Sequence, residues 1–373
     1  MKGKIDRKET IFVLVMVACI ILLVLLPTGF ARPIYVNSEG AKVRILEADD
    51  SSVYINGIIK QGDQSCVVEI LSGSHKGEQT KAINLLVGKM DLDKMFKPGD
   101  IAWAIIENKA DGSIVFANLV DHYRVDKELI LIGVFAVLLV LFSGFTGIRT
   151  LLSFAFALLA IWKLLIPMTL KGYPPVWVAL AVGCSISIIT LIMVAGLTKK
   201  AYAAIGGAIA CSLVTCLLSI FYTKYMGIDG SVMQWSESLL YSGYQNLDLT
   251  QVFMAAVYLA CSGAILDLAI DISAALDELV VHKPDITRME LVRSGLTIGK
   301  SVVGSQTTTL LLAYMGSYLS ILMVYMAQAT PWMSIINSKT VASEILHTFV
   351  GCIGLVLVAP ATSVICALMY AKK

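Results

Sequence analysis

Long, uninterrupted runs of apolar residues dominate this chain. A helix needs about 20 such residues to cross the hydrocarbon core of a bilayer, and eight runs have this length: 11–30, 129–147, 150–168, 174–197, 201–223, 252–281, 302–327 and 343–369. The first follows the basic start MKGKIDRKE and lacks a clear small-residue cleavage site, so we interpret it as a retained anchor. The pattern predicts an α-helical polytopic membrane protein with eight transmembrane helices.

A different pattern fills the stretch between the first two spans. Residues 32–128 contain short segments rich in β-branched residues and bounded by Gly, Asp, Asn or Pro: KVRILEA, SVYINGII, SCVVEILSG, DIAWAII and SIVFANLV. Five or six strands in so short a stretch are typical of a small β-barrel or sandwich. We therefore expect an anchor helix at 1–31, a β-rich domain at 32–128 and a seven-helix membrane domain at 129–373.

Composition supports the membrane class. The 373 residues are 57% hydrophobic and 15% charged, whereas soluble domains are about 45–50% apolar and about 25% charged. Seven of the eight cysteines lie in apolar runs, and Cys66 is alone in the β-rich domain, so no disulfide can form within that domain. We expect membrane lipid around the helices, and no cofactor, metal or nucleic acid.

Lysine and arginine indicate the orientation, because cytoplasmic loops carry an excess of both. With the N-terminus inside, the outer loops hold only Lys171, Lys224 and Lys339. Lys163 falls within a span, where we expect it to snorkel toward the outer interface. Both termini are thus expected in the cytoplasm and residues 32–128 outside. The basic residues on the cytoplasmic side are Lys2, Lys4, Arg7, Lys8, Arg149, Lys199, Lys200, Lys283, Arg288, Arg293, Lys300, Lys372 and Lys373.

Acidic residues interrupt the apolar run at 252–281. At 100° per residue, Asp267, Asp271 and Glu278 share one narrow stripe of this helix. A charged Asp near the bilayer centre costs about 2.5–3.5 kcal/mol, so the stripe must face protein or water. Such acids mark ion or proton pathways by default, and the alternative is a structural clamp to a neighbouring helix. Glu278 is expected near the interface, where a solvated acid is ordinary.

The helix at 302–327 is the expected partner of these acids. Thr307 and Tyr314 share one of its stripes, and Gln306 and Ser317 lie on an adjoining one. We expect Asp267 or Asp271 to approach these supporting polar groups. The alternative is that the hydroxyls bond carbonyls of their own helix.

The segments on either side of this helix carry further signals. HKPDITRMELVRSGLTIGK, which precedes it, is typical of a separate amphipathic helix on the cytoplasmic surface, with Asp285 or Thr287 as N-cap. The last span contains EILH, in which Glu344 and His347 have the spacing of metal ligands. No second such pair accompanies them, so a metal site is not favoured. Further along the same span, Gly351 and Gly354 followed by Pro360 predict close packing or a kink.

Several of these segments together resemble the YibE/F family of bacterial multi-pass membrane proteins. The resemblance covers nearly the whole chain and is most specific in SGFTGIRTLLSF, AGLTKKAYAAIGG, GAILDLAIDISAALDEL and SGLTIGKSVVGSQTTTLLLAYMGS. Where the family reads T-M-x-N-T, this chain has SQTTT at 305–309. The resemblance implies a protein of the bacterial plasma membrane that acts as a transporter of unassigned substrate. A looser architectural likeness links the chain to SecD and SecF of the proton-driven RND superfamily.

Two function classes follow from these patterns. The first is an ion- or proton-coupled membrane transporter, which explains the acids and their hydroxylated neighbour. The second is an assembly or export-accessory protein whose outer domain binds a protein partner. An enzyme is not expected, because the chain has no HExxH zinc motif and no phosphate-binding loop, and its spanning acids lie essentially on one helix.

Overall fold

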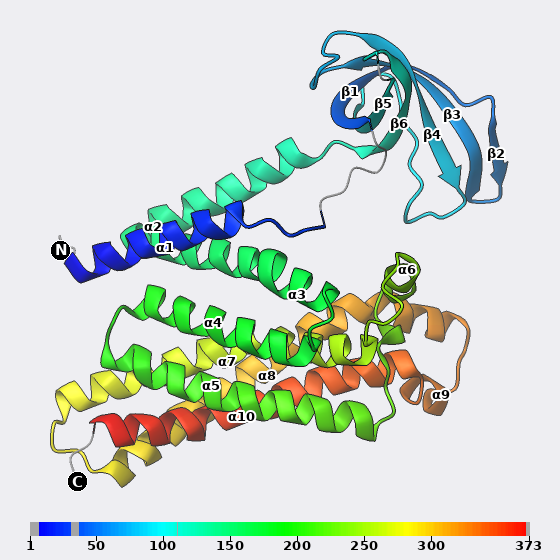
Figure 1. Cartoon of the computed structure of the whole chain (residues 1–373). Coiled ribbons are helices and arrows are strands. Elements are labelled where there is room, and N and C mark those ends of the chain that lie inside the picture. The colour runs from blue at the N-terminus through cyan, green and yellow to red at the C-terminus, as the bar shows by residue number, and fades with distance from the viewer. Residues whose placement is uncertain (1–6, 31–36, 110, 371–373) are drawn as a thin grey trace. The chain divides into compact units, whose positions relative to one another are not determined.

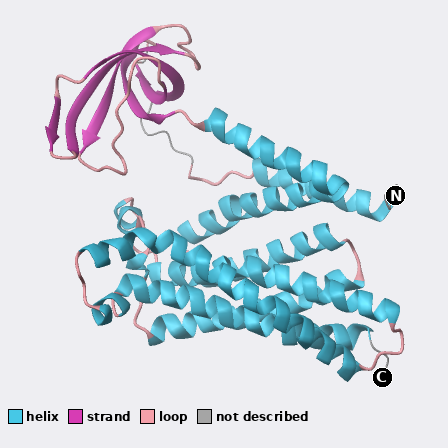
Figure 2. Cartoon of the chain, turned by 180° about the vertical axis from the view of Figure 1, so that it is seen from behind, coloured by secondary structure: helices cyan, strands magenta, loops and turns pink. Residues whose placement is uncertain are grey.

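A computed structural model describes residues 7–30, 37–109 and 111–370 of the chain (Figure 1). Its contacts divide the chain into two compact units. Residues 30–138 form one, which we call the barrel unit, and residues 1–29 with 139–373 form the other, which we call the membrane unit. Among the described residues, the strands belong to the barrel unit (Figure 2).

The barrel unit contains a small closed β-barrel, which confirms the expected β-rich domain. Its strands form one sheet in the order β1–β5–β6–β4–β3–β2, and an additional β1–β3 pairing closes it. β4 and β6 run parallel, whereas the other pairs are antiparallel. This is the strand arrangement of an OB-type barrel. The strands are β1 (Ser38–Asp49), β2 (Val53–Asn56), β3 (Ile59–Ile70), β4 (Gln79–Val87), β5 (Ile101–Asn108) and β6 (Ile114–His122).

Among the described residues, the buried interior of the barrel is apolar except for one amide pair. Alternate residues of each strand point inward, as Ala41, Val43 and Ile45 do on β1. Gln64 and Asn84 are also fully buried, and the Asn84 amide donates to Gln64 Oε1 over 3.0 Å. Gln64 additionally bonds both backbone groups of Phe96. The pair therefore anchors the long β4–β5 connection to the barrel wall.

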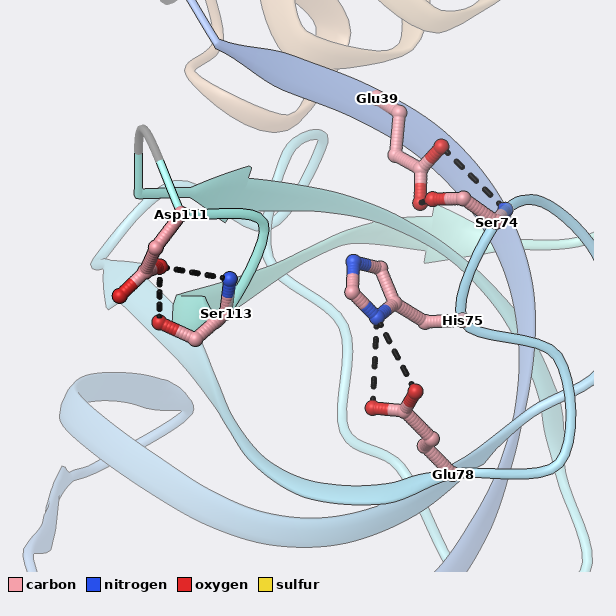
Figure 3. A network of polar contacts seen from close by, with 6 residues as sticks. All are labelled: Glu39, Ser74, His75, Glu78, Asp111 and Ser113. Carbon is pink, nitrogen blue, oxygen red and sulfur yellow. Dashed lines mark hydrogen bonds and ion pairs between the residues drawn. The ribbon is translucent and has the colours of Figure 1, made fainter.

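Short polar contacts fix the loops at one rim of the barrel (Figure 3). The hydroxyl of Ser74 donates to Glu39, and His75 Nδ1 lies 3.2 Å from Glu78 Oε2. In the β5–β6 turn, the hydroxyl and backbone N–H of Ser113 donate to Asp111. These bonds hold the pKa of the Asp111 carboxyl below its ordinary value. The His75 and Ser113 contacts lie within single turns, whereas the Ser74 contact ties the β3–β4 loop to β1.

Helices build the membrane unit, and the first part of the helix Val125–Ala160, up to Leu138, belongs to the barrel unit. The chain order is α1 (Arg7–Leu25), α2 (Val125–Ala160), the π-helical turn η1 (Ile161–Leu165), α3 (Ile166–Leu170), α4 (Pro175–Ala195), α5 (Lys199–Tyr225), the 3₁₀ turn η2 (Gly230–Val232), α6 (Ser236–Tyr241), α7 (Leu249–His282), α8 (Arg288–Ala327), α9 (Trp332–Ile336) and α10 (Lys339–Tyr370).

Within the described residues, six helical runs qualify as membrane spans, and α1 adds a shorter apolar helix. The runs expected at 129–147 and 150–168 fall in one helical stretch, Val125–Leu170. Gly144 interrupts that stretch with φ 58° and ψ −130°, a conformation that few other residues adopt. The break thus lies a few residues before the expected boundary between the runs 129–147 and 150–168. The count of eight spans and their orientation remain predictions.

α8 corrects the expectation of a separate cytoplasmic helix. It begins at the N-cap Thr287, whose side chain and that of Glu290 form a capping box. From there it runs for 40 residues without a break. The amphipathic segment and the following span are therefore one helix. The glycines between them remain helical, and no proline interrupts the segment.

The core of the membrane unit lies where α5, α7 and α10 pack together. Small residues permit this close approach. A Cβ atom added to Gly354 of α10 would overlap the Thr215 hydroxyl of α5, and one added to Gly351 would come within 2.9 Å of Leu310 on α8. α10 continues through Pro360 to Tyr370. Lys163 donates to the carbonyls of Val24 and Leu26, and so caps the end of α1.

Candidate functional site

The three predicted acids lie on one exposed face of α7. Asp267, Asp271 and Glu278 are all exposed, and the opposite face, with Ile265 and Ile272, is fully buried in the core. α7 begins at the N-cap Asp248, whose carboxylate accepts from the backbone N–H of Gln251. The helix period therefore places the acids as the sequence indicated, with the apolar residues directed inward.

These acids have few contacts within the described residues. Glu278 Oε1 lies 3.2 Å from Nε2 of His282, one turn later on α7. Asp271 is close enough to interact electrostatically with Asp267. In the part of the chain that the structure describes, neither aspartate has a hydrogen bond or an ion pair. Carboxylates are costly against lipid, so these two residues are candidates for a functional role.

The supporting polar residues on α8 do not reach the α7 acids in the described structure. The hydroxyl of Thr307 donates to the carbonyl of Gly304, and that of Ser317 donates to the carbonyl of Tyr314. Both therefore bond their own helix, which was the alternative interpretation. Gln306 is half-buried on the same helix.

Tyr314 is directed toward α10, where it meets a buried carboxylate–imidazole pair. Its ring stacks on His347 at a centroid distance of 5.6 Å, and Phe253 of α7 contacts the same imidazole at 5.1 Å. His347 Nδ1 lies 3.1 Å from Glu344 Oε1. Glu344 is only 9% exposed, and the Tyr318 hydroxyl lies close to its carboxylate. α7, α8 and α10 thus meet at this pair.

Several polar atoms of the cluster are unsatisfied. Among the described residues, Glu344 Oε2, His347 Nε2 and the Tyr314 hydroxyl are buried without a hydrogen-bond partner. A buried polar group without a partner costs about 1–3 kcal/mol. Such a concentration of unpaired groups is typical of a site that binds a proton, water or ligand.

A cavity of about 280 Å³ adjoins this pair. It lies between α8, α9 and the first turns of α10. Aliphatic and aromatic side chains form nearly all of its accessible wall. The residues that line it are Leu311, Tyr314, Met315, Tyr318, Leu322, Trp332, Ile335, Ile336, Val341, Glu344, Ile345, Thr348 and Phe349.

Metal chemistry has little support in these side chains. Across the described ranges, no group of three or more His, Cys, Asp and Glu residues could hold a metal ion. Glu344 and His347 supply two ligands, whereas structural and catalytic zinc sites use three or four protein ligands.

The sequence did contain a signal for this cluster. The E-x-x-H spacing of Glu344 and His347 is visible, and the polar stripe of α8 includes Tyr314. What the sequence could not give is the contact between α8 and α10 that encloses the pair. Polar stripes indicate that a helix needs a partner, and they do not indicate which helix supplies it.

An apolar patch lies on the outer wall of the barrel. Tyr54 pairs with Gln61 across β2–β3, and Gln61 pairs with Val87 across β3–β4, so all three point to the same side. Along that side, Tyr54 is 76% exposed and Leu85 is 55% exposed. We call this the β2–β4 patch, and it comprises Tyr54, Ile59, Ile83, Leu85 and Val87.

Comparison with known protein families matches residues 131–372 to the YibE/F-like proteins. No curated protein and no solved structure matches the chain. The matched region includes the α7 acids, the polar stripe of α8 and the buried pair of α10. Since it covers more than half of the sequence, the chain belongs to the YibE/F-like family.

Proposed function

We propose that this protein is a proton-coupled transporter of the bacterial plasma membrane, and that it is not an enzyme. The observation that carries the proposal is the buried Glu344–His347 pair, with its unpartnered oxygen and nitrogen. Ionisable groups in membrane helices are costly, and they typically mark ion or proton pathways. The excess of Lys and Arg in the loops assigned to the cytoplasm supports cytoplasmic termini and an outer barrel.

The pair is suited to hold one exchangeable proton. With the imidazole neutral and the carboxylate ionised, the site carries one negative charge. One added proton, on either group, makes it neutral. An apolar setting strengthens electrostatic interactions, so this change is able to alter how α10 packs against α8 and α7.

The acids of α7 are proposed as a second set of coupling groups. Asp267 and Asp271 are one turn apart, and two carboxylates this close resist simultaneous ionisation. Their exposed face requires water or another protein chain. Glu278, paired with His282 near the end of α7, is the least protected of the three.

The test is proton flux in proteoliposomes that contain the purified full chain and an internal pH-sensitive dye. A proton gradient is imposed, and candidate solutes are added in turn. The proposal predicts solute-dependent proton movement that Glu344→Gln abolishes and Glu237→Gln preserves, since Glu237 is an exposed residue of α6. Proton movement that persists unchanged in Glu344→Gln would contradict it.

A second function, assembly or export accessory, is favoured by the β2–β4 patch. Exposed apolar side chains gathered on one wall are typical of a protein interface. The partner would be an extracytoplasmic protein that covers Leu85 and Val87. Copurification of a defined partner that is lost in Leu85→Lys, and kept in Lys60→Glu on the opposite side of the sheet, would support this function. Equal recovery with both variants would exclude the patch as the interface.

A further inference from the structure

The cavity beside Glu344 combines apolar walls with a single buried acid. Four aromatic side chains contribute to its lining: Tyr314, Tyr318, Trp332 and Phe349. α9, which carries Trp332, lies at the end of the bundle where α8 ends and α10 begins (Figure 1). The apolar walls favour an apolar ligand body, and the carboxylate favours a positive charge.

The surrounding groups leave that negative charge without a fixed cation. The titratable groups of α8 that face the pair are Tyr314 and Tyr318. Two thiols, Cys261 of α7 and Cys352 of α10, lie near Tyr314. α7 contributes the apolar ring of Phe253, and α9 contributes Trp332. Lys339, at the start of α10, forms an ion pair with Asp229. Within the described residues, the imidazole of His347 is the basic group paired with Glu344.

We propose that this cavity binds a small lipophilic organic cation, such as a quaternary or tertiary ammonium with one aromatic ring, in exchange for the proton of the Glu344–His347 pair. The inference rests on the proposed transport function and names the substrate class. One cation enters as one proton leaves, so the charge of the site stays constant. The ammonium contacts the aromatic faces, which attract cations. The Glu344 carboxylate, buried just behind the apolar wall, attracts it through space.

Size and charge exclude other classes of ligand. The cavity, about 280 Å³, lies just below the range of about 300–1,000 Å³ of ordinary small-molecule pockets. A ligand with more than one ring would need the helices to separate. Anions are repelled by the buried carboxylate, and a neutral apolar solute gains nothing from its negative charge.

The experiment uses benzyltrimethylammonium, which has no proton to donate. Its binding to the full chain in detergent is measured by calorimetry, and proton release is followed with a pH indicator in weak buffer. We expect saturable binding with release of up to one proton per cation, and no binding of benzenesulfonate. Glu344→Gln should weaken binding at least tenfold and abolish the release, whereas Glu237→Gln should match the wild type.

A second variant covers the case in which Glu344→Gln fails to fold. Met315→Trp fills the cavity from α8 without altering the charged pair, and it should block binding of the cation. Binding that is unaffected by both variants, binding without proton release, or no binding to the wild type would overturn the inference.

The two proposals fail in different ways. Cation binding with proton release, but no flux in proteoliposomes, would support the site and contradict the transport function. Proton flux coupled to another solute, without cation binding, would support the transport function and contradict the cation site.

Discussion

Nδ1 of His347 lies 3.1 Å from Oε1 of Glu344, one helical turn earlier on α10. Both side chains are largely buried, and neither group is fully satisfied within the described residues. The pair stands where α7 and α8 pack against α10, so a change in its charge acts on three helices at once. This arrangement is the basis of the function proposed above.

Replacing the paired acids of α7 tests whether they couple protons. Asp267→Asn with Asp271→Asn should insert and fold normally, because a neutral amide is cheaper in a membrane than a carboxylate. The double variant should nevertheless lose proton-dependent flux in proteoliposomes. Glu278→Gln should have a smaller effect, since Glu278 is exposed and paired with His282. Wild-type flux in the double variant would show that these acids serve only the structure.

Close packing at Gly354 gives a stability prediction. A methyl group there would overlap the hydroxyl of Thr215, so Gly354→Ala should lower the free energy of unfolding by about 1–3 kcal/mol. Gly304→Ala on α8 is the matched control, because nothing lies within 4 Å of its added Cβ. Alanine is more favourable than glycine inside a helix by up to about 1 kcal/mol, so this control variant should not lose stability. Thermal unfolding of the purified variants in detergent measures both, and equal melting temperatures would refute the packing account.

The ion pair between Asp229 and Lys339 predicts a pH dependence. Hydrogen bonds from Lys339 and Ser231 lower the pKa of Asp229 to about 2. A carboxyl whose pKa falls on folding stabilises the protein above its unfolded pKa, and this stabilisation is lost as the pH drops toward the folded value. Asp229→Asn should therefore lower the melting temperature slightly at pH 7, with a difference that shrinks between pH 4 and pH 2. The effect is small because both side chains are largely exposed. A difference that grows on acidification would contradict this sign.

Cys66 and an introduced surface cysteine test the orientation. Cys66 is 2% exposed inside the barrel, and burial raises the pKa of its thiol to about 11, so it should resist a membrane-impermeant maleimide while the barrel is folded. Lys60→Cys, at an exposed position of β3, should be labelled in intact cells. Labelling of that variant only in inverted vesicles would place the barrel in the cytoplasm.

Periodicity was sufficient for most elements of this fold. Runs of apolar residues located the long helices, and β-branched segments located five of the strands. β4 was missed because its sequence, QTKAINLLV, does not alternate clearly: the polar Asn84 points inward, and the apolar Ile83 and Leu85 point outward. The long α8 and the break at Gly144 also differed from expectation, because helix boundaries depend on packing and backbone geometry that local patterns report weakly.

The candidate site was less accessible to sequence reasoning. The face of α7 that carries Asp267 and Asp271 follows directly from the helix period. The enclosure of Glu344 does not, since it depends on Tyr314 of α8 and Phe253 of α7 reaching the same imidazole. Such contacts join residues far apart in the chain, and they cannot be predicted from the pattern of a single sequence.

Infrared difference spectroscopy of the purified protein tests directly whether Glu344 and His347 share one exchangeable proton. Spectra recorded across a pH titration are compared between the wild type and Glu344→Gln, with Glu237→Gln as control. We expect a pH-dependent carboxyl or imidazole band, equivalent to one proton, that is absent only from Glu344→Gln and that shifts when benzyltrimethylammonium is added. Identical titration spectra for the wild type and Glu344→Gln would contradict the claim.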